Sequence, residues 1–170
     1  MLELKEFTKN LIDEKLSEKC PSMNYSIKYS SRLTKCLGRC QSRDSSYTKV
    51  TFTFNENYTK YCEENNLIEE FKDVVLHEIA HALTGYIDGR GHGHDWMWKL
   101  RCREVGANPT RLSDTEWTAP AKYIYVCPKC GKRIERATKW RINHACKDCC
   151  TKYGNGKYSE EFKFTLKEVA

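Results

Sequence analysis

Four cysteines near the C-terminus form two C-x-x-C pairs, Cys127 with Cys130 and Cys146 with Cys149. Two such pairs at this separation are typical of a zinc ribbon, in which four thiolates close the tetrahedral coordination sphere of a structural zinc ion. We therefore predict that these four cysteines bind one Zn²⁺. Much of the folding free energy of the surrounding segment is then expected to come from the metal.

The other six cysteines lack such spacing. Cys150 adjoins one pair and, like His144, is an alternative ligand, but the symmetric set is simpler. The remaining five are predicted to be small buried thiols: Cys20, Cys36, Cys40, Cys62 and Cys102. Residues 1–16 contain no uninterrupted apolar run, so neither a signal peptide nor a membrane span is expected. We expect a cytoplasmic protein with reduced thiols.

Apolar periodicity upstream of the ribbon predicts an α+β fold. Residues 2–19 follow the helical period, whereas residues 23–29 and 50–54 alternate apolar with polar side chains, as half-buried strands do. Residues 32–40 are a further candidate strand. We expect a three-stranded antiparallel sheet packed against helices.

The most apolar helix is expected from Asn66 to Gly85. Its apolar stripe consists of Ile68, Phe71, Val75, Ile79 and Leu83. The same helix contains the H-E-x-x-H motif of His77, Glu78 and His81, and the two histidines lie about 200° around the helix from the stripe. The pattern therefore predicts a helix that buries one face and exposes its histidines on the other.

Two histidines four residues apart can present their imidazoles to one metal ion. Zinc bound there would polarise a peptide carbonyl and lower the pKa of a bound water, and Glu78 would act as the general base that takes the water's proton. The motif around His77 and His81 thus predicts a zinc metallopeptidase, with Glu78 as its catalytic residue.

Catalytic zinc normally has three protein ligands. His92 and His94 lie in a glycine-rich loop, and Glu104 lies on the next predicted helix, which Asp95 caps and Gly106 ends. Spacing alone does not choose among these three candidates.

Aromatic residues surround this loop. Tyr86, Trp96 and Trp98 are expected to pack in the core rather than to act in catalysis. A hydrogen-bond donor to the oxyanion is also needed, and Tyr86, His94 and Arg101 are equal candidates.

The metzincin pattern is absent, because Thr84 and Ile87 stand where that class requires glycine and histidine. The H-E-x-x-H motif followed by residues 91–96 instead resembles the SprT-like family, which includes the Spartan proteases. The resemblance extends to residues 37–40 and to the ribbon. It implies a zincin-like domain and, through the family's H-G-x-x-aromatic motif, makes His92 the third ligand, with Trp96 as the aromatic residue.

The charge divides the chain into an expected metallopeptidase domain, 1–118, and a ribbon with a short β tail, 119–170. The first part has 17 basic and 18 acidic residues, and the second has 12 and 5. The candidate nucleic-acid residues in the ribbon are Lys129, Lys132, Arg133, Arg136, Lys139, Trp140 and Arg141. Interleaved cations and aromatic rings suit phosphate contact and base stacking, so single-stranded DNA is the favoured partner.

These features combine into one functional hypothesis: a zinc-dependent endopeptidase that acts on DNA-associated or DNA-crosslinked proteins. The DNA link follows the resemblance, because Spartan proteases use a zinc-binding segment to engage DNA in DNA–protein crosslink repair. Two alternatives remain, namely a non-enzymatic nucleic-acid-binding zinc protein and a peptidase with no link to DNA.

Overall fold

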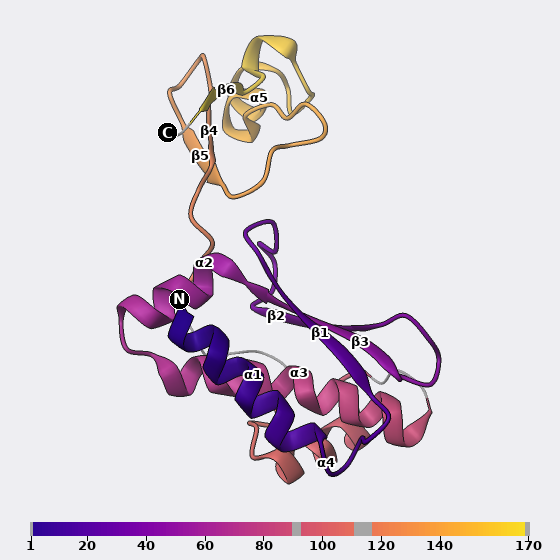
Figure 1. Cartoon of the computed structure of the whole chain (residues 1–170). Coiled ribbons are helices and arrows are strands. Elements are labelled where there is room, and N and C mark those ends of the chain that lie inside the picture. The colour runs from indigo at the N-terminus through magenta and orange to yellow at the C-terminus, as the bar shows by residue number, and fades with distance from the viewer. Residues whose placement is uncertain (1, 90–92, 111–116, 169–170) are drawn as a thin grey trace. The chain divides into compact units, whose positions relative to one another are not determined.

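The computed structural model describes residues 2–89, 93–110 and 117–168 (Figure 1). Contacts divide the chain into two compact units, Met1–Trp117 and Thr118–Ala170, which are described separately below. Each unit contains its own hydrophobic cluster. Within the described residues, no helix is both long enough and apolar enough to cross a membrane.

The first unit contains a three-stranded sheet of β1 (Asn24–Ser30), β2 (Gly38–Ser42) and β3 (Lys49–Asn55) in the order β1-β3-β2. β2 is antiparallel to β3, but β1 is parallel to it, so the sheet is mixed and the expectation of an antiparallel sheet was wrong. β3 is the central strand, and it has the most buried side chains of the three.

Four helices complete the first unit: α1 (Leu2–Leu16), α2 (Glu56–Glu64), α3 (Ile68–Asp88) and α4 (Trp96–Val105). α1 and α3 lie side by side on one side of the sheet, and α4 packs on α3 (Figure 1). α3 also contacts β2. The longest helix therefore lies between the edge strand and α4, and both neighbours can add side chains to its exposed face.

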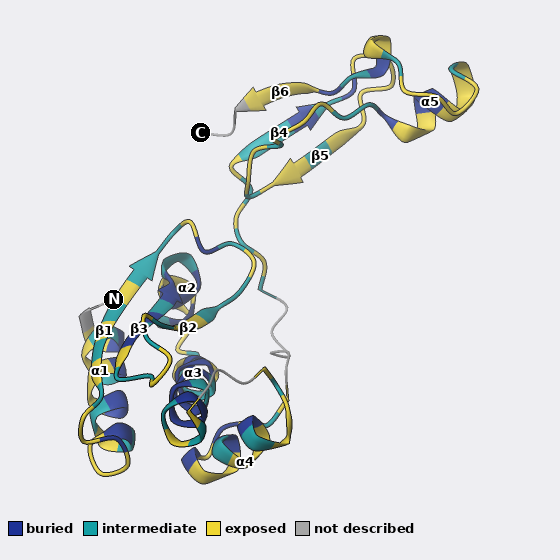
Figure 2. Cartoon of the chain, turned by 90° about the vertical axis from the view of Figure 1, so that its right-hand side faces the viewer, coloured by how far each residue is buried: buried dark blue, intermediate teal, exposed yellow. Residues whose placement is uncertain are grey.

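The core of the first unit forms where α3 meets the sheet. Phe54 of β3 packs edge-on against Phe71 of α3, with 5.8 Å between ring centroids. Phe71, Val75, Ile79 and Leu83 have no exposed surface, which confirms most of the predicted stripe, but Ile68 is 42% exposed. Figure 2 shows this burial along α3. Each fully buried side chain of this size stabilises the fold by about 1.5–3 kcal/mol, and the buried face fixes the rotation of α3.

α2 was not predicted from the sequence, and it begins immediately after β3. Asn55 ends the strand and caps the helix, because its side-chain oxygen accepts hydrogen bonds from the backbone N–H groups of Asn57 and Tyr58 at 3.0 and 3.1 Å. Its amide nitrogen donates to the carbonyl of Leu33. One buried side chain therefore joins a strand, a helix and the segment that leads into β2.

The second unit has a three-stranded antiparallel sheet in the order β5-β4-β6. Its elements are β4 (Tyr123–Val126), β5 (Arg133–Arg136), α5 (Lys147–Tyr153), the 3₁₀ helix η1 (Glu160–Phe162) and β6 (Thr165–Glu168). Buried aromatic residues surround the cysteines, among them Tyr125, Phe162 and Phe164.

Candidate metal and catalytic site

α3 carries the H-E-x-x-H motif, with its two histidines on consecutive turns. The ring centroids of His77 and His81 are 5.1 Å apart, so both imidazoles lie on one side of the helix. α3 continues for two turns beyond His81 and ends at Gly89, whose φ of 70° is the left-handed conformation that glycine adopts most easily. The motif is thus held within a regular helix.

His94 brings a third imidazole to this pair. Its Nε2 lies 3.1 Å from Nε2 of His77 and 3.3 Å from Nε2 of His81. Tetrahedral zinc with Zn–N bonds of about 2.0–2.1 Å separates its ligand nitrogens by about 3.3–3.4 Å. The three histidines therefore fit a zinc ion. His92, the ligand implied by the resemblance, lies outside the described residues.

The start of α4 fixes the position of His94. Asp95 caps the helix, and its Oδ1 accepts hydrogen bonds from the N–H groups of Met97 and Trp98, both at 3.1 Å. This confirms the predicted cap. Because the cap immediately follows His94, the imidazole is attached to a regular helix rather than to the middle of a loop.

Trp98 packs against all three imidazoles. Its ring centroid is 4.7 Å from that of His77, 5.3 Å from His81 and 4.5 Å from His94, and the residue has no exposed surface. Trp96, in contrast, is 71% exposed, so the expected packing in the core holds for Trp98 and for the half-buried Tyr86 but not for Trp96. His94 and Trp98 are four residues apart, the histidine-to-aromatic spacing that the resemblance assigned to His92 and Trp96. This spacing in the sequence could have indicated that Trp98 packs beside a metal-binding histidine, although Asp95 stands where the H-G-x-x-aromatic motif has glycine.

Glu78 lies at the edge of the core stripe and contacts β2. It is only 6% exposed, and a Cβ atom at Gly38 would lie 2.8 Å from its Cγ and Oε1. Burial raises the pKa of Glu78 to about 8, although a hydrogen bond from the backbone N–H of Cys40 opposes the shift. Burial also lowers the pKa of His77 to about 4, helped by His94, which favours the neutral imidazole that binds metal.

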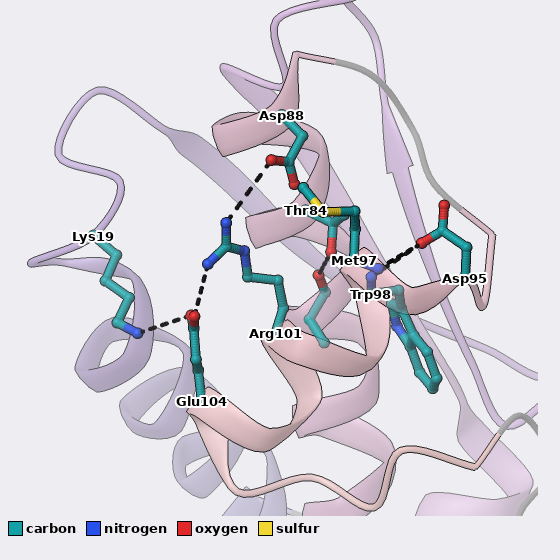
Figure 3. Close-up of polar contacts among 9 residues, drawn as sticks. Lys19, Thr84, Asp88, Asp95, Met97, Trp98, Arg101 and Glu104 are labelled. Atoms are coloured by element: carbon teal, nitrogen blue, oxygen red, sulfur yellow. Dashed lines mark hydrogen bonds and ion pairs between the residues drawn. The ribbon is translucent and has the colours of Figure 1, made fainter.

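Glu104, the carboxylate alternative for the third ligand, is engaged elsewhere. Its Oε1 accepts a hydrogen bond from Arg101 at 2.7 Å, and its Oε2 lies 3.4 Å from Nζ of Lys19 (Figure 3). Arg101 also approaches Asp88 near the end of α3, with 3.8 Å between Nη2 and Oδ1. These ion pairs connect α3, α4 and the segment after α1. Glu104 is therefore not part of the set of side chains that converge as metal ligands, which consists of the three histidines.

The four predicted ribbon cysteines also converge. The Sγ atoms of Cys127 and Cys149 are 3.8 Å apart, as are those of Cys130 and Cys146. Tetrahedral zinc with Zn–S bonds of about 2.3 Å separates its sulfurs by about 3.8 Å, so this set fits zinc as well. Cys150 is buried but is not part of the set.

The thiols of the set differ in pKa, which burial raises for Cys146 and Cys149. Burial also acts to raise the pKa of Cys127, but hydrogen bonds from the backbone N–H groups of Cys130 and Lys129, together with those from the thiols of Cys130 and Cys149, lower it to about 7.

Five of the seven predicted nucleic-acid residues fall into two groups. Lys132 pairs with Asp148 at 2.7 Å, and Lys129 lies 3.9 Å from Glu161, so their charges are partly neutralised within the unit. A second group borders an open cavity of about 570 Å³. This group consists of Lys139, Trp140 and Arg141, and His144, Lys163 and Phe164 also line the cavity.

The cavity has an aromatic wall. The ring of Trp140 lies 4.0 Å from that of Tyr125 and 4.4 Å from that of His144, between centroids. The guanidinium of Arg136 lies over the same indole at 5.6 Å. Arg133 is exposed on β5 and does not line the cavity. The second unit therefore combines a cysteine centre with a basic, aromatic hollow.

The fold and the two centres define the class of protein: an α+β domain with a three-histidine site beside a buried glutamate, followed in the chain by a four-cysteine ribbon. Comparison with known protein families identifies the family to which this class corresponds. The profile of the SprT-like family matches residues 4–117, and the chain belongs to that family.

Two curated relatives are similar to this chain. The germ cell nuclear acidic-1 protein of Caenorhabditis elegans is 29% identical over 126 residues, which cover 70% of this chain and 22% of that protein. The human germ cell nuclear acidic protein is 27% identical over 138 residues, covering 78% and 19%. The chain thus spans about a fifth of the length of these relatives.

Proposed function

We propose that this chain is a zinc-dependent endopeptidase that acts on proteins associated with DNA or crosslinked to it. The observation that carries the peptidase assignment is the convergence of His77, His81 and His94 next to the buried carboxylate of Glu78. We assign these three histidines as the zinc ligands. A structural zinc site has no need for an adjacent carboxylate that is not a ligand, so Glu78 favours an enzyme over the non-enzymatic alternative.

When bound, zinc supplies a Lewis acid that polarises the scissile carbonyl and acidifies a water. The chain's own residues do the remaining work. Glu78 takes a proton from the attacking water and delivers it to the leaving amine, and its raised pKa matches a group that must both accept and return a proton near neutral pH. Trp98 covers the imidazoles and keeps bulk water from their inner side.

The DNA link is supported by the second unit. Lys139, Arg141 and Trp140 meet at one cavity, where the cations can contact phosphates and the half-buried indole of Trp140 can contact an unpaired base. The paired residues Lys129 and Lys132 are expected to contribute less. Single-stranded DNA is therefore the proposed partner of this surface.

The peptidase assignment is tested with Glu78→Gln, which preserves shape but removes the base. We expect wild-type protein to cleave a basic DNA-bound protein and Glu78→Gln to lose at least roughly 100-fold in rate while keeping its zinc. Glu70→Gln, an exposed change on the same helix, is the matched control. Cleavage that survives Glu78→Gln contradicts the proposal.

The DNA link is tested separately by binding of labelled single-stranded DNA over a range of salt concentrations. Lys139→Ala with Arg141→Ala is expected to weaken binding and to reduce the salt dependence by about 0.7 per lost phosphate contact, whereas Lys132→Ala is expected to change little. If the cleavage rate is the same with and without DNA, and the variants bind single-stranded DNA as tightly as the wild type, this surface does not connect the peptidase to DNA.

A further inference from the structure

The proposed reaction requires a donor for the negative charge that develops on the scissile carbonyl oxygen, and the three sequence candidates are engaged elsewhere. The hydroxyl of Tyr86 lies 2.6 Å from Ser22 Oγ. Arg101 is paired with Glu104 and Asp88. His94 faces the other two imidazoles. The donor must therefore be sought on another element that borders α3.

Tyr47, in the loop between β2 and β3, is such a residue. Its ring lies directly on α3 at Gly85, where an added Cβ would be 2.3–2.4 Å from the ring atoms Cγ, Cδ1 and Cε1. Gly85 follows His81 by four residues and Glu78 by seven, which is about one turn and two turns of helix. The phenol therefore lies on the face of α3 that carries the catalytic motif.

The backbone holds Tyr47 in an unusual conformation. Its φ is 53°, in the left-handed region that bulky residues seldom adopt. The turn is fixed by Asp44, whose carboxylate accepts hydrogen bonds from the N–H of Thr48 at 3.0 Å and from its hydroxyl at 3.2 Å. Strained conformations of this kind persist where surrounding structure enforces them, and they cluster at functional sites.

Tyr47 and Glu78 also share a neighbour. Burial raises the pKa of the Tyr47 phenol, and the nearby thiol of Cys40 raises it further. Burial also raises the pKa of Cys40 itself, and the nearby carboxylate of Glu78 adds to that shift. Tyr47 is half-buried, and within the described ranges its hydroxyl makes no hydrogen bond. A phenolic donor thus lies in the neighbourhood of the general base without a fixed partner.

We propose that Tyr47 is a further catalytic residue whose hydroxyl donates a hydrogen bond to the scissile carbonyl oxygen, an inference that rests on the proposed peptidase function. As the water oxygen bonds to the carbonyl carbon, the π electrons move to the carbonyl oxygen, and Tyr47 stabilises the charge there. Glu78 takes the water's proton. When the C–N bond breaks, the carbonyl reforms and this proton passes to the amine.

Tyr47→Phe tests the inference, because it keeps the ring on Gly85 and removes only the hydroxyl. We expect kcat to fall roughly 100-fold with KM changed little, since a donor to the oxyanion acts mainly in the transition state. Affinity for a peptide phosphinate, which mimics the tetrahedral species, should fall while zinc content and melting temperature are unchanged. Tyr29→Phe, at a half-buried tyrosine that packs on Phe54, is the matched control.

The outcomes separate the two proposals. If wild-type protein cleaves peptide and Tyr47→Phe keeps its kcat and its phosphinate affinity, Tyr47 is only a packing residue and the inference is overturned, while the peptidase assignment stands. If zinc-loaded wild-type protein neither cleaves peptide nor binds the phosphinate, the peptidase assignment fails and the inference falls with it.

Discussion

The backbone of Gly38 touches the side chain of Glu78, because a Cβ atom on this glycine would lie 2.8 Å from the Cγ and Oε1 atoms of the glutamate. The edge strand β2 thus leaves the space that the buried carboxylate fills. The next inward-facing residue of the strand, Cys40, donates its N–H to the same group. The strand therefore acts as the wall that desolvates and orients Glu78.

Gly38→Ala is expected to displace Glu78. The added methyl overlaps the glutamate side chain, and overpacking of this kind costs about 1–3 kcal/mol of stability. We expect a peptidase rate reduced by more than tenfold together with a modest fall in melting temperature. Gln41→Ala, an exposed change in the same strand, should leave both quantities unaltered. A fully active Gly38→Ala protein would show that the position of Glu78 is not set by this contact.

The third ligand is decided by comparing His94→Ala with His92→Ala. Because Nε2 of His94 lies within 3.1–3.3 Å of the other two histidines, we expect His94→Ala to lose zinc from the first unit and His92→Ala to retain it. Zinc per chain measured by atomic emission, with the ribbon ion as an internal reference, gives the answer. The opposite result would favour the motif position implied by the resemblance.

Stability should depend on pH through Glu78. The pKa of this group is raised from 4.5 to about 8 in the folded protein, so the folded state holds a proton that the unfolded state has released between these values. In metal-free protein, the stability of the wild type relative to Glu78→Gln should therefore decrease as pH rises from about 4.5 to 8, by roughly 1 kcal/mol per pH unit.

Urea unfolding of both proteins at several pH values measures this difference. The depressed pKa of His77 acts in the opposite direction, reducing stability as pH falls from 6.5 toward about 4. It is common to both proteins and largely cancels. A difference that does not change with pH would mean that Glu78 is solvated in solution.

In the ribbon, Cys149→Ser and Cys150→Ser form a matched pair of adjacent buried thiols. Only Cys149 is among the converging sulfurs, so Cys149→Ser should lose the ribbon zinc and unfold the second unit, and Cys150→Ser should retain the metal. Zinc content and amide exchange in β4 report the two results. Loss of zinc from the Cys150→Ser protein would show that Cys150 is a zinc ligand.

The parts of the site predicted from sequence are those set by local spacing. The H-E-x-x-H motif, the stripe of α3 and the Asp95 cap depend on contacts within a few residues, and the structure contains all three. The convergence of the four cysteines follows similarly from their paired spacing.

What the sequence did not provide depends on tertiary contacts. The direction of β1 is set by its pairing with β3, which follows β2 in the chain, and alternation alone carries no information about strand direction. The closeness of Gly38 to Glu78, and of Tyr47 to Gly85, arises where the sheet meets α3. Neither contact leaves a periodic signal in the sequence.

The contact of Trp98 with the three imidazoles also makes the site visible to spectroscopy. An indole within about 5 Å of the ligand rings is close enough for a paramagnetic ion such as Co²⁺ to quench its fluorescence, whereas diamagnetic Zn²⁺ lacks this effect. With the other three tryptophans replaced by phenylalanine, the fluorescence of Trp98 reports which metal occupies the three-histidine site and how fast that metal exchanges.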